Sequence, residues 1–153
     1  MRIAEVLYEN IDTSNLPKII DSTRKAYNDR GISTYDICNG ECENFIYDVM
    51  RQLKRDDWVE GSEFQIVETL NFVIQTDEYE IIDWDWDLLK KHWNMSPPDG
   101  VTLEQMKLLA QYDPTHVWLT VGTKHYDAEA PNGVNTFFEL PFFKRWIDWA
   151  KTQ

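Results

Sequence analysis

Residues 115–129 are the segment that most constrains the fold of this chain. Apolar and polar side chains alternate along it, and it is rich in β-branched and aromatic residues, which is typical of β-strands. Gly122 and Thr123 interrupt the pattern at its centre, and glycine suits the first central position of a two-residue type II′ turn. The sequence therefore predicts a β-hairpin that turns at Gly122-Thr123.

This turn length fixes which residues face one another across the hairpin. Val121 is expected opposite Lys124, and Thr120 opposite His125. Because opposed residues share a face, we expect one face to carry His116, Trp118, Thr120, His125, Asp127 and Glu129. The other face is expected to carry Val117, Leu119, Val121 and Tyr126. His116 and Asp127 are then diagonal neighbours, roughly 7 Å apart at Cα and within side-chain reach.

A histidine beside a carboxylate on a rigid hairpin supplies two members of a nucleophilic triad. Glu129 competes with Asp127 for the role of carboxylate, because it lies opposite His116 on the same register. The nucleophile should come from elsewhere, and Cys42 is the candidate, since it opens a helix predicted over about 41–54. Cys42 shares the apolar face of that helix with Phe45, Ile46, Val49, Met50 and Leu53.

The start of a helix is a favourable place for a reactive cysteine. The positive end of the helix dipole and its free N–H groups favour the thiolate, and so does a nearby protonated histidine. The same N–H groups can stabilise an oxyanion, to which the Asn39 amide could also donate, and Gly40 would let substrate backbone approach. Glu41 and Glu43 oppose this activation, because negative charge raises the pKa of a thiol.

Three motifs carry a resemblance to a known superfamily: Gly40-Glu41-Cys42-Glu43-Asn44-Phe45, His116-Val117-Trp118-Leu119 and His125-Tyr126-Asp127. In this order they resemble the papain-like cysteine hydrolases in the broad sense. They look most similar to the transglutaminase-like branch and the bacterial cell-wall cysteine peptidases. No glutamine precedes Cys42 at the papain-type spacing for an oxyanion donor, which favours those other branches.

The resemblance implies a fold, a site and an activity. The fold would be α+β, with a small antiparallel sheet packed against the helix of the catalytic cysteine. Cys42 would be the nucleophile, His116 the general base and acid, and Asp127 the orienting residue, with Asn39, Gly40 and Trp118 at the oxyanion and substrate site. The activity would be hydrolysis or acyl transfer at a peptide, isopeptide or glutamine amide bond. Two stretches, 126–131 and 140–143, also resemble small bacteriophage-encoded proteins, which would act in the host cell.

Two other interpretations of the cysteines and histidines stay open. A cysteine on an apolar helix face is usually a core residue, and His116 and Asp127 would then be an ordinary strand histidine and a solvated acid. Zinc could alternatively be bound by Cys38, Cys42, His116 and His125, which are four soft ligands. Their spacing does not match the usual zinc motifs, so we expect no metal and no other cofactor.

The rival function rests on an acidic segment rich in tryptophan. Asp83, Asp85 and Asp87 alternate there with Trp84 and Trp86. Tryptophan anchors within a carboxylate rim are typical of a protein-binding surface. The chain could therefore be an acidic binding module or inhibitor without catalysis, including a mimic of nucleic-acid charge.

Charge and cysteine content narrow the partners and the compartment. The net charge of −12 argues against nucleic acid or an anionic membrane as a partner. It suits a basic protein partner, although solubility alone also accounts for it. Four residues apart, Cys38 and Cys42 fit poorly to a disulfide within a helix, which favours a reducing compartment. With neither a membrane-spanning run nor a signal-peptide core, we expect a cytoplasmic protein with a single domain over 1–153.

The remaining patterns predict the rest of the secondary structure. A short strand is expected near residues 3–7, a helix with its N-cap within Asp12-Thr13-Ser14 and its end at Gly31, an irregular stretch over 32–40 and a strand over 64–74. Thr102-Leu103-Glu104-Gln105 predicts a capping box at the start of a helix. Pro131-Asn132-Gly133 predicts a turn, and Leu140-Pro141 precedes a last amphipathic helix.

Overall fold

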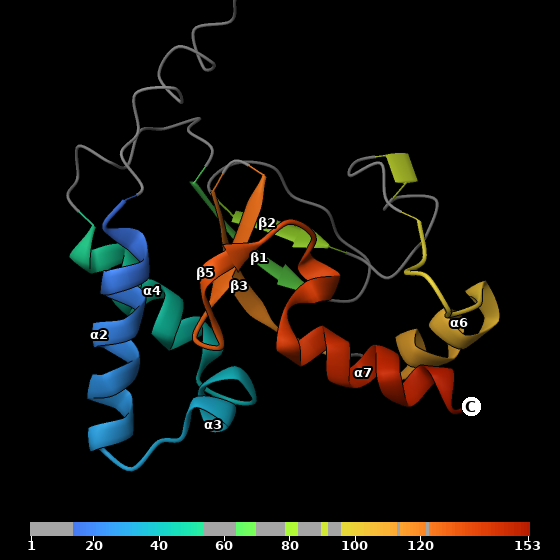
Figure 1. Ribbon diagram of the computed structural model, residues 1–153, viewed down its shortest axis with the longest axis horizontal. Coiled ribbons are helices and arrows are strands. Elements are labelled where there is room, and N and C mark those ends of the chain that lie inside the picture. Colours follow the sequence, from blue (N-terminus) through green and yellow to red (C-terminus); the bar gives the residue numbers. More distant parts are fainter. Residues whose placement is uncertain are drawn as a thin grey trace, which may run out of the picture.

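The computed structural model describes residues 14–53, 64–69, 79–82, 90–91, 96–112, 114–121 and 123–153. Within these residues helices cover a small central sheet, so the chain has the expected α+β architecture (Figure 1). Four expectations lie wholly or partly outside the described residues: the strand near residues 3–7, residues 70–74 of the strand expected over 64–74, the acidic tryptophan-rich segment around 83–87, and the conformation of Gly122.

The sheet has five strands in the order β2-β1-β3-β4-β5. The strands are β1 (Phe64–Thr69), β2 (Tyr79–Ile82), β3 (Val117–Val121), β4 (Lys124–Asp127) and β5 (Ala130–Val134). The pairs β1–β3, β3–β4 and β4–β5 are antiparallel. Strand β2 pairs with the other edge of β1 and runs parallel to it. The expected antiparallel sheet is therefore present, with one parallel strand added at its edge.

The hairpin of β3 and β4 has the predicted register. Val121 pairs with Lys124 and Thr120 with His125, so the connection has the two-residue length inferred from the sequence. The predicted faces are confirmed as well. Val117, Leu119, Val121 and Tyr126 belong to one hydrophobic core, while Trp118 belongs to another on the opposite face.

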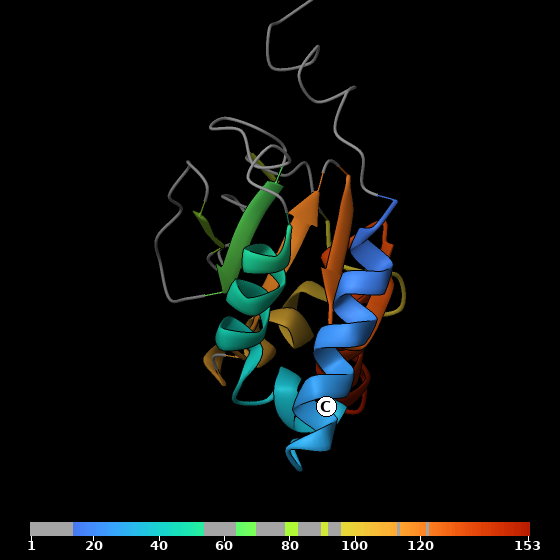
Figure 2. The same ribbon diagram turned by 90° about the vertical axis from the view of Figure 1, so that its left-hand side faces the viewer.

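Helices α2 (Leu16–Asp29) and α4 (Cys42–Gln52) cover the first of these faces, and the short α3 (Thr34–Cys38) connects them (Figure 2). Phe45, Ile46 and Val49 of α4 share a core with the inward residues of β3. The cysteine-bearing helix therefore packs against the sheet as predicted, and it begins at Cys42.

Helices α6 (Leu103–Gln111) and α7 (Pro141–Lys151) lie on the opposite side of the sheet (Figure 1). A single 3₁₀ turn, η2 (Phe137–Glu139), leads into α7. Phe137 and Phe143 pack against Trp118, with ring centroids 5.1 and 5.3 Å from the indole. The predicted capping box is present at the start of α6, where Thr102 and Gln105 bond each other's backbone N–H. None of the described helices combines the length and apolarity needed to cross a bilayer.

Residues 32–40 differ from the expected irregular stretch. Ser33 caps α3, because its hydroxyl accepts a hydrogen bond from the Asp36 N–H at 3.1 Å. This cap satisfies one of the N–H groups that a helix start leaves unpaired, and it allows a helix of only five residues. The last residue of α3 is Cys38, whose sulfur lies within 4.8 Å of the side chains of His116 and Asp127.

The predicted turn at Pro131-Asn132-Gly133 is wrong. These residues lie within β5, and the chain reverses earlier, at Ala128 and Glu129. Gly133 has a φ of +78°, and a Cβ atom there would lie 2.7 Å from the Tyr126 ring. Close packing of the neighbouring strand against the backbone therefore accounts for this glycine, rather than a reversal of the chain.

Candidate active site

Cys42 opens onto a pocket at the end of the sheet where β3 begins. The side chain is half-buried, at the first residue of α4. The pocket has a volume of about 450 Å³ and is lined by Asn39, Gly40, Cys42, Glu43, Tyr112, Pro114, Thr115, Val117, Phe142 and Trp146. The predicted nucleophile thus has a solvent-accessible space in which a substrate can lie.

His116 immediately precedes β3 and is completely buried. Its Nε2 lies 2.8 Å from Oδ2 of Asp127, so the diagonal contact predicted from the hairpin register is present. The Phe142 ring stacks on the imidazole at a centroid distance of 4.4 Å, and Phe143 meets it edge-on. The imidazole is therefore held by a carboxylate at one nitrogen and by aromatic rings around it.

Asp127, the last residue of β4, is the carboxylate that pairs with His116. It is 1% exposed, and its second oxygen, Oδ1, accepts a hydrogen bond from the Glu129 N–H at 2.9 Å. The Glu129 side chain turns away to Arg145, with two contacts of 2.8 Å. Of the two acids that competed for this role in the sequence, the geometry therefore selects Asp127.

The thiol and the imidazole influence each other's ionisation. Burial raises the pKa of Cys42, but a hydrogen bond to His116, the charge of His116 and backbone N–H groups of Val117 and Glu43 outweigh burial, and the pKa lies below its ordinary value. Burial lowers the pKa of His116, but hydrogen bonds and charges from Asp127 and Cys42 outweigh it and raise that pKa to about 9. Both shifts favour a thiolate–imidazolium pair.

His116 interacts with both other members of the candidate site. Its Nε2 lies 2.8 Å from Asp127 Oδ2, and a side-chain hydrogen bond to Cys42 contributes to its raised pKa. A carboxylate at one nitrogen fixes the tautomer and orientation of the ring, and the other nitrogen can then exchange a proton with the nucleophile. This arrangement can generate a nucleophile and return a proton to a leaving group.

Asn39 and Gly40, which the sequence predicts at the oxyanion and substrate site, both line the Cys42 pocket. The Asn39 amide nitrogen donates to the Tyr35 carbonyl at 2.8 Å, which anchors the side chain to the end of α3. A Cβ atom at Gly40 would have the Asp36 carbonyl, at 3.8 Å, as its neighbour, so packing within the protein does not require glycine here.

Trp118 lies elsewhere than expected. It is fully buried, and its indole N–H lies within hydrogen-bond distance of the Thr120 hydroxyl, at 3.0 Å, and of His125 Nδ1, at 3.2 Å. Trp146 of α7 lines the pocket instead. From the sequence, Trp146 is expected only as a packing residue of the last amphipathic helix. The signal that could have found it is its spacing of four residues from Phe142, which places both rings on one side of α7.

The four residues weighed as zinc ligands are not gathered at one point. His125 belongs to the Thr120–Trp118 cluster, while Cys38, His116 and Asp127 have ligand atoms within 4.8 Å of one another. Burial raises the pKa of the Cys38 thiol, and the charges of Asp127 and Glu129 raise it further. A thiol binds metal as the thiolate, so the raised pKa of Cys38 makes the cluster of Cys38, His116 and Asp127 a poor set of metal ligands.

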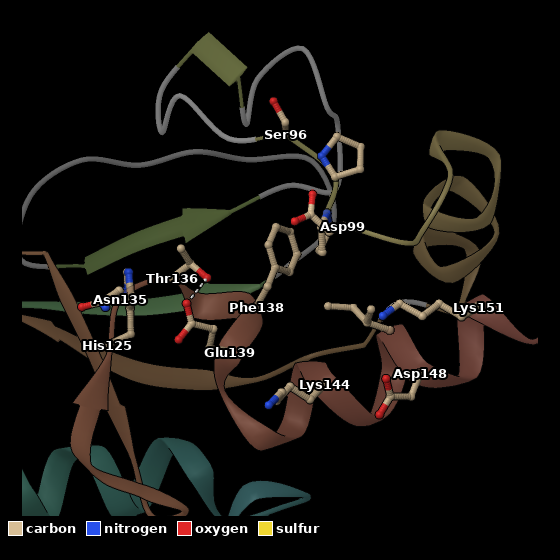
Figure 3. A pocket seen from close by; sticks show the side chains of 13 residues that line it. Ser96, Asp99, His125, Asn135, Thr136, Phe138, Glu139, Lys144, Asp148 and Lys151 are labelled. Carbon is tan, nitrogen blue, oxygen red and sulfur yellow. Dashed lines mark hydrogen bonds between the residues drawn. The ribbon is translucent and has the colours of Figure 1, made fainter.

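A second pocket, of about 620 Å³, lies between α7 and the segment before α6 (Figure 3). His125 lines it together with the charged side chains of Asp99, Glu139, Lys144, Asp148 and Lys151. Burial lowers the pKa of His125 to about 4, and its Nδ1 lies 2.8 Å from the Thr120 hydroxyl. This histidine is therefore neutral near pH 7 and pairs with a hydroxyl, unlike His116.

In comparisons with protein-family models, curated proteins and solved structures, nothing matched this chain. The candidate site therefore rests on the geometry of its own residues.

The two cysteines should differ in reactivity. Near neutral pH we expect iodoacetamide to alkylate Cys42 faster than Cys38, because Cys42 is half-buried with a lowered pKa, whereas Cys38 is 1% exposed with a raised pKa. Peptide mapping by mass spectrometry after timed labelling of the folded protein measures both rates. Equal, slow labelling of the two residues would contradict an activated Cys42.

Proposed function

We propose that this chain is a cysteine-dependent hydrolase or acyl transferase that acts on an amide bond through Cys42, His116 and Asp127. The observation that carries the proposal is the buried contact of 2.8 Å between His116 Nε2 and Asp127 Oδ2, beside a half-buried Cys42 with a lowered pKa. A thiol, an imidazole and a carboxylate in sequence are the parts that nucleophilic acyl chemistry requires.

In the proposed reaction the Cys42 thiolate attacks the carbonyl carbon of the amide, and the electron pair of the C=O bond moves to oxygen. The tetrahedral intermediate then collapses, the C–N bond breaks, and His116 gives its proton to the departing amine. A thioester on Cys42 remains. Water or a second amine, deprotonated by His116, attacks this thioester and releases the acid or the new amide together with the thiol.

We also propose that the fold is a papain-like core of the transglutaminase-like kind. Three features support this relationship. A helix that starts at the cysteine packs against the sheet, the histidine precedes a strand of that sheet, and the aspartate ends the next strand. The order of cysteine, histidine and aspartate along the chain is the one that the resemblance implies.

A small activated ester tests the proposal without knowledge of the natural substrate. The full chain is mixed with p-nitrophenyl acetate, and intact-mass spectrometry with peptide mapping follows which residues are acetylated over time. We expect one acetyl group to appear on Cys42 faster than on Cys38, because only a thiolate with a proton donor beside it forms the thioester rapidly. Loss of the acetyl group in buffer indicates hydrolysis, and faster loss on addition of a primary amine indicates acyl transfer.

The Cys42→Ala variant is the control, and it should release p-nitrophenol at the rate of buffer. Acetylation spread over lysines in both proteins, with none on Cys42, would contradict the proposed function. The acidic, tryptophan-rich binding module would then become the better hypothesis for this chain.

A further inference from the structure

The Asp127 carboxylate is oriented by a turn as well as by His116. One oxygen faces His116 Nε2 at 2.8 Å, and the other accepts the Glu129 backbone N–H at 2.9 Å. Both contacts are buried or nearly so, and Asp127 is 1% exposed. The position of the Glu129 backbone therefore determines how the carboxylate meets the imidazole.

The side chain of Glu129 is held in turn by Arg145. Both guanidinium NH groups donate to the two carboxylate oxygens at 2.8 Å, a bidentate arrangement that restricts orientation as well as distance. Arg145 also lies over the Tyr35 ring, 4.9 Å from its centroid, so the guanidinium is bounded on two sides. The ion pair thus links α7 and α3 to the turn between β4 and β5.

Helix α7 supports the histidine from the same side. Phe142, which stacks on His116, lies three residues before Arg145 on α7. Residues three apart project from one side of a helix, so a single rigid element contacts both the imidazole and the turn that orients its carboxylate. A shift of α7 would therefore displace both the His116 ring and the turn that orients the Asp127 carboxylate.

We propose that Arg145 and Glu129 are positioning residues for the Cys42–His116–Asp127 site: Arg145 holds Glu129 in place, and the Glu129 N–H orients the Asp127 carboxylate toward His116. This inference rests on the proposed function. The competing explanation is an ordinary partly exposed ion pair, which contributes a little to stability and nothing to reactivity.

The test measures the rate of Cys42 alkylation by iodoacetamide as a function of pH, together with the melting temperature. In Arg145→Gln we expect alkylation near neutral pH to slow by about fivefold, the size of a coupling of about 1 kcal/mol. The pH at which the His116 imidazolium loses its proton should also be lower in this variant, because a misaligned Asp127 stabilises the imidazolium less. Arg145→Lys, which keeps the charge but not the bidentate fork, should recover part of the rate.

Arg24→Gln is the matched control. Arg24 pairs with Asp21 at 2.6 Å, and its side chain is 33% exposed, against 39% for Arg145, but it lies on α2 away from the pocket lining. It should leave the alkylation profile unchanged. Glu129→Gln gives a second route, since it keeps the backbone N–H while removing the charge that binds Arg145, and it should resemble Arg145→Gln.

The outcomes separate this inference from the proposed function. In one outcome Cys42 of the wild-type protein is activated, and Arg145→Gln has the same alkylation profile as wild type but a lower melting temperature. That result would show that the Arg145–Glu129 ion pair has a structural role only. A wild-type Cys42 with the pH profile of an ordinary thiol would overturn both proposals. Should Arg145→Gln fail to fold, an unchanged profile in Glu129→Gln would by itself overturn the positioning role.

Discussion

Replacing Cys42 by alanine or His116 by glutamine should reduce acyl-transfer turnover by roughly 10⁴-fold or more. In the proposed reaction Cys42 supplies the electron pair that forms the thioester, and His116 supplies the proton for the leaving group, so neither loss could be compensated by the other. The double variant should be no slower than either single variant, because members of such a unit act together. Steady-state release of p-nitrophenol, corrected for the buffer rate, measures all three.

The hairpin offers a close control for the histidine substitution. His125 is also buried and lies on β4, but it bonds to Thr120 and lines the second pocket. His125→Gln should therefore keep most of the turnover, even though it perturbs a buried hydrogen bond. Similar losses in both histidine variants, at similar melting temperatures, would count against a specific role for His116.

Replacing Asp127 by asparagine should slow turnover by roughly 10²–10⁴-fold and change its pH dependence. The wild-type rate should fall at low pH as the Cys42 thiolate is protonated, and at high pH as His116 loses its proton near pH 9. The neutral amide of the variant would lack the charge that raises the pKa of His116, while burial would still lower it. The alkaline limb should therefore move to lower pH, which a rate profile from about pH 5 to 10 would reveal.

Glu129→Gln provides the comparison for this variant. Glu129 was the competing partner of His116 on the sequence register, but its carboxylate bonds to Arg145. Its substitution should therefore cost far less than that of Asp127. If Glu129→Gln were the more damaging of the two, His116 would have to depend on Glu129 in solution, contrary to the contact at 2.8 Å with Asp127.

The hairpin shows which parts of this site follow from sequence. A side-chain period of two and a two-residue turn determine the register, and the register determines that His116 and Asp127 are diagonal neighbours. The apolar face that Cys42 shares with Phe45 and Ile46 likewise predicts that its helix packs on the sheet. Both inferences depend on regular local geometry, and the structure agrees with both.

Contacts between distant elements did not follow from sequence. Alternation puts Trp118 on the face of His116, but it does not reveal that α7 and η2 cover that face and bury the indole. For the same reason Trp146 was not recognised as a pocket residue. The partner of Glu129 is sixteen residues away on another element, and no local period connects it with Arg145.

The candidate site lies between the two hydrophobic cores on opposite faces of the sheet, and this has a consequence for folding. Cys42 packs with the core formed by α2 and α4, whereas His116 is stacked by Phe142 and Phe143 from the core on the opposite face. A chain in which only one layer has condensed would hold either the thiol or the imidazole in place, but not both. The proposed reactivity of Cys42 would therefore require both layers of the fold to be in place.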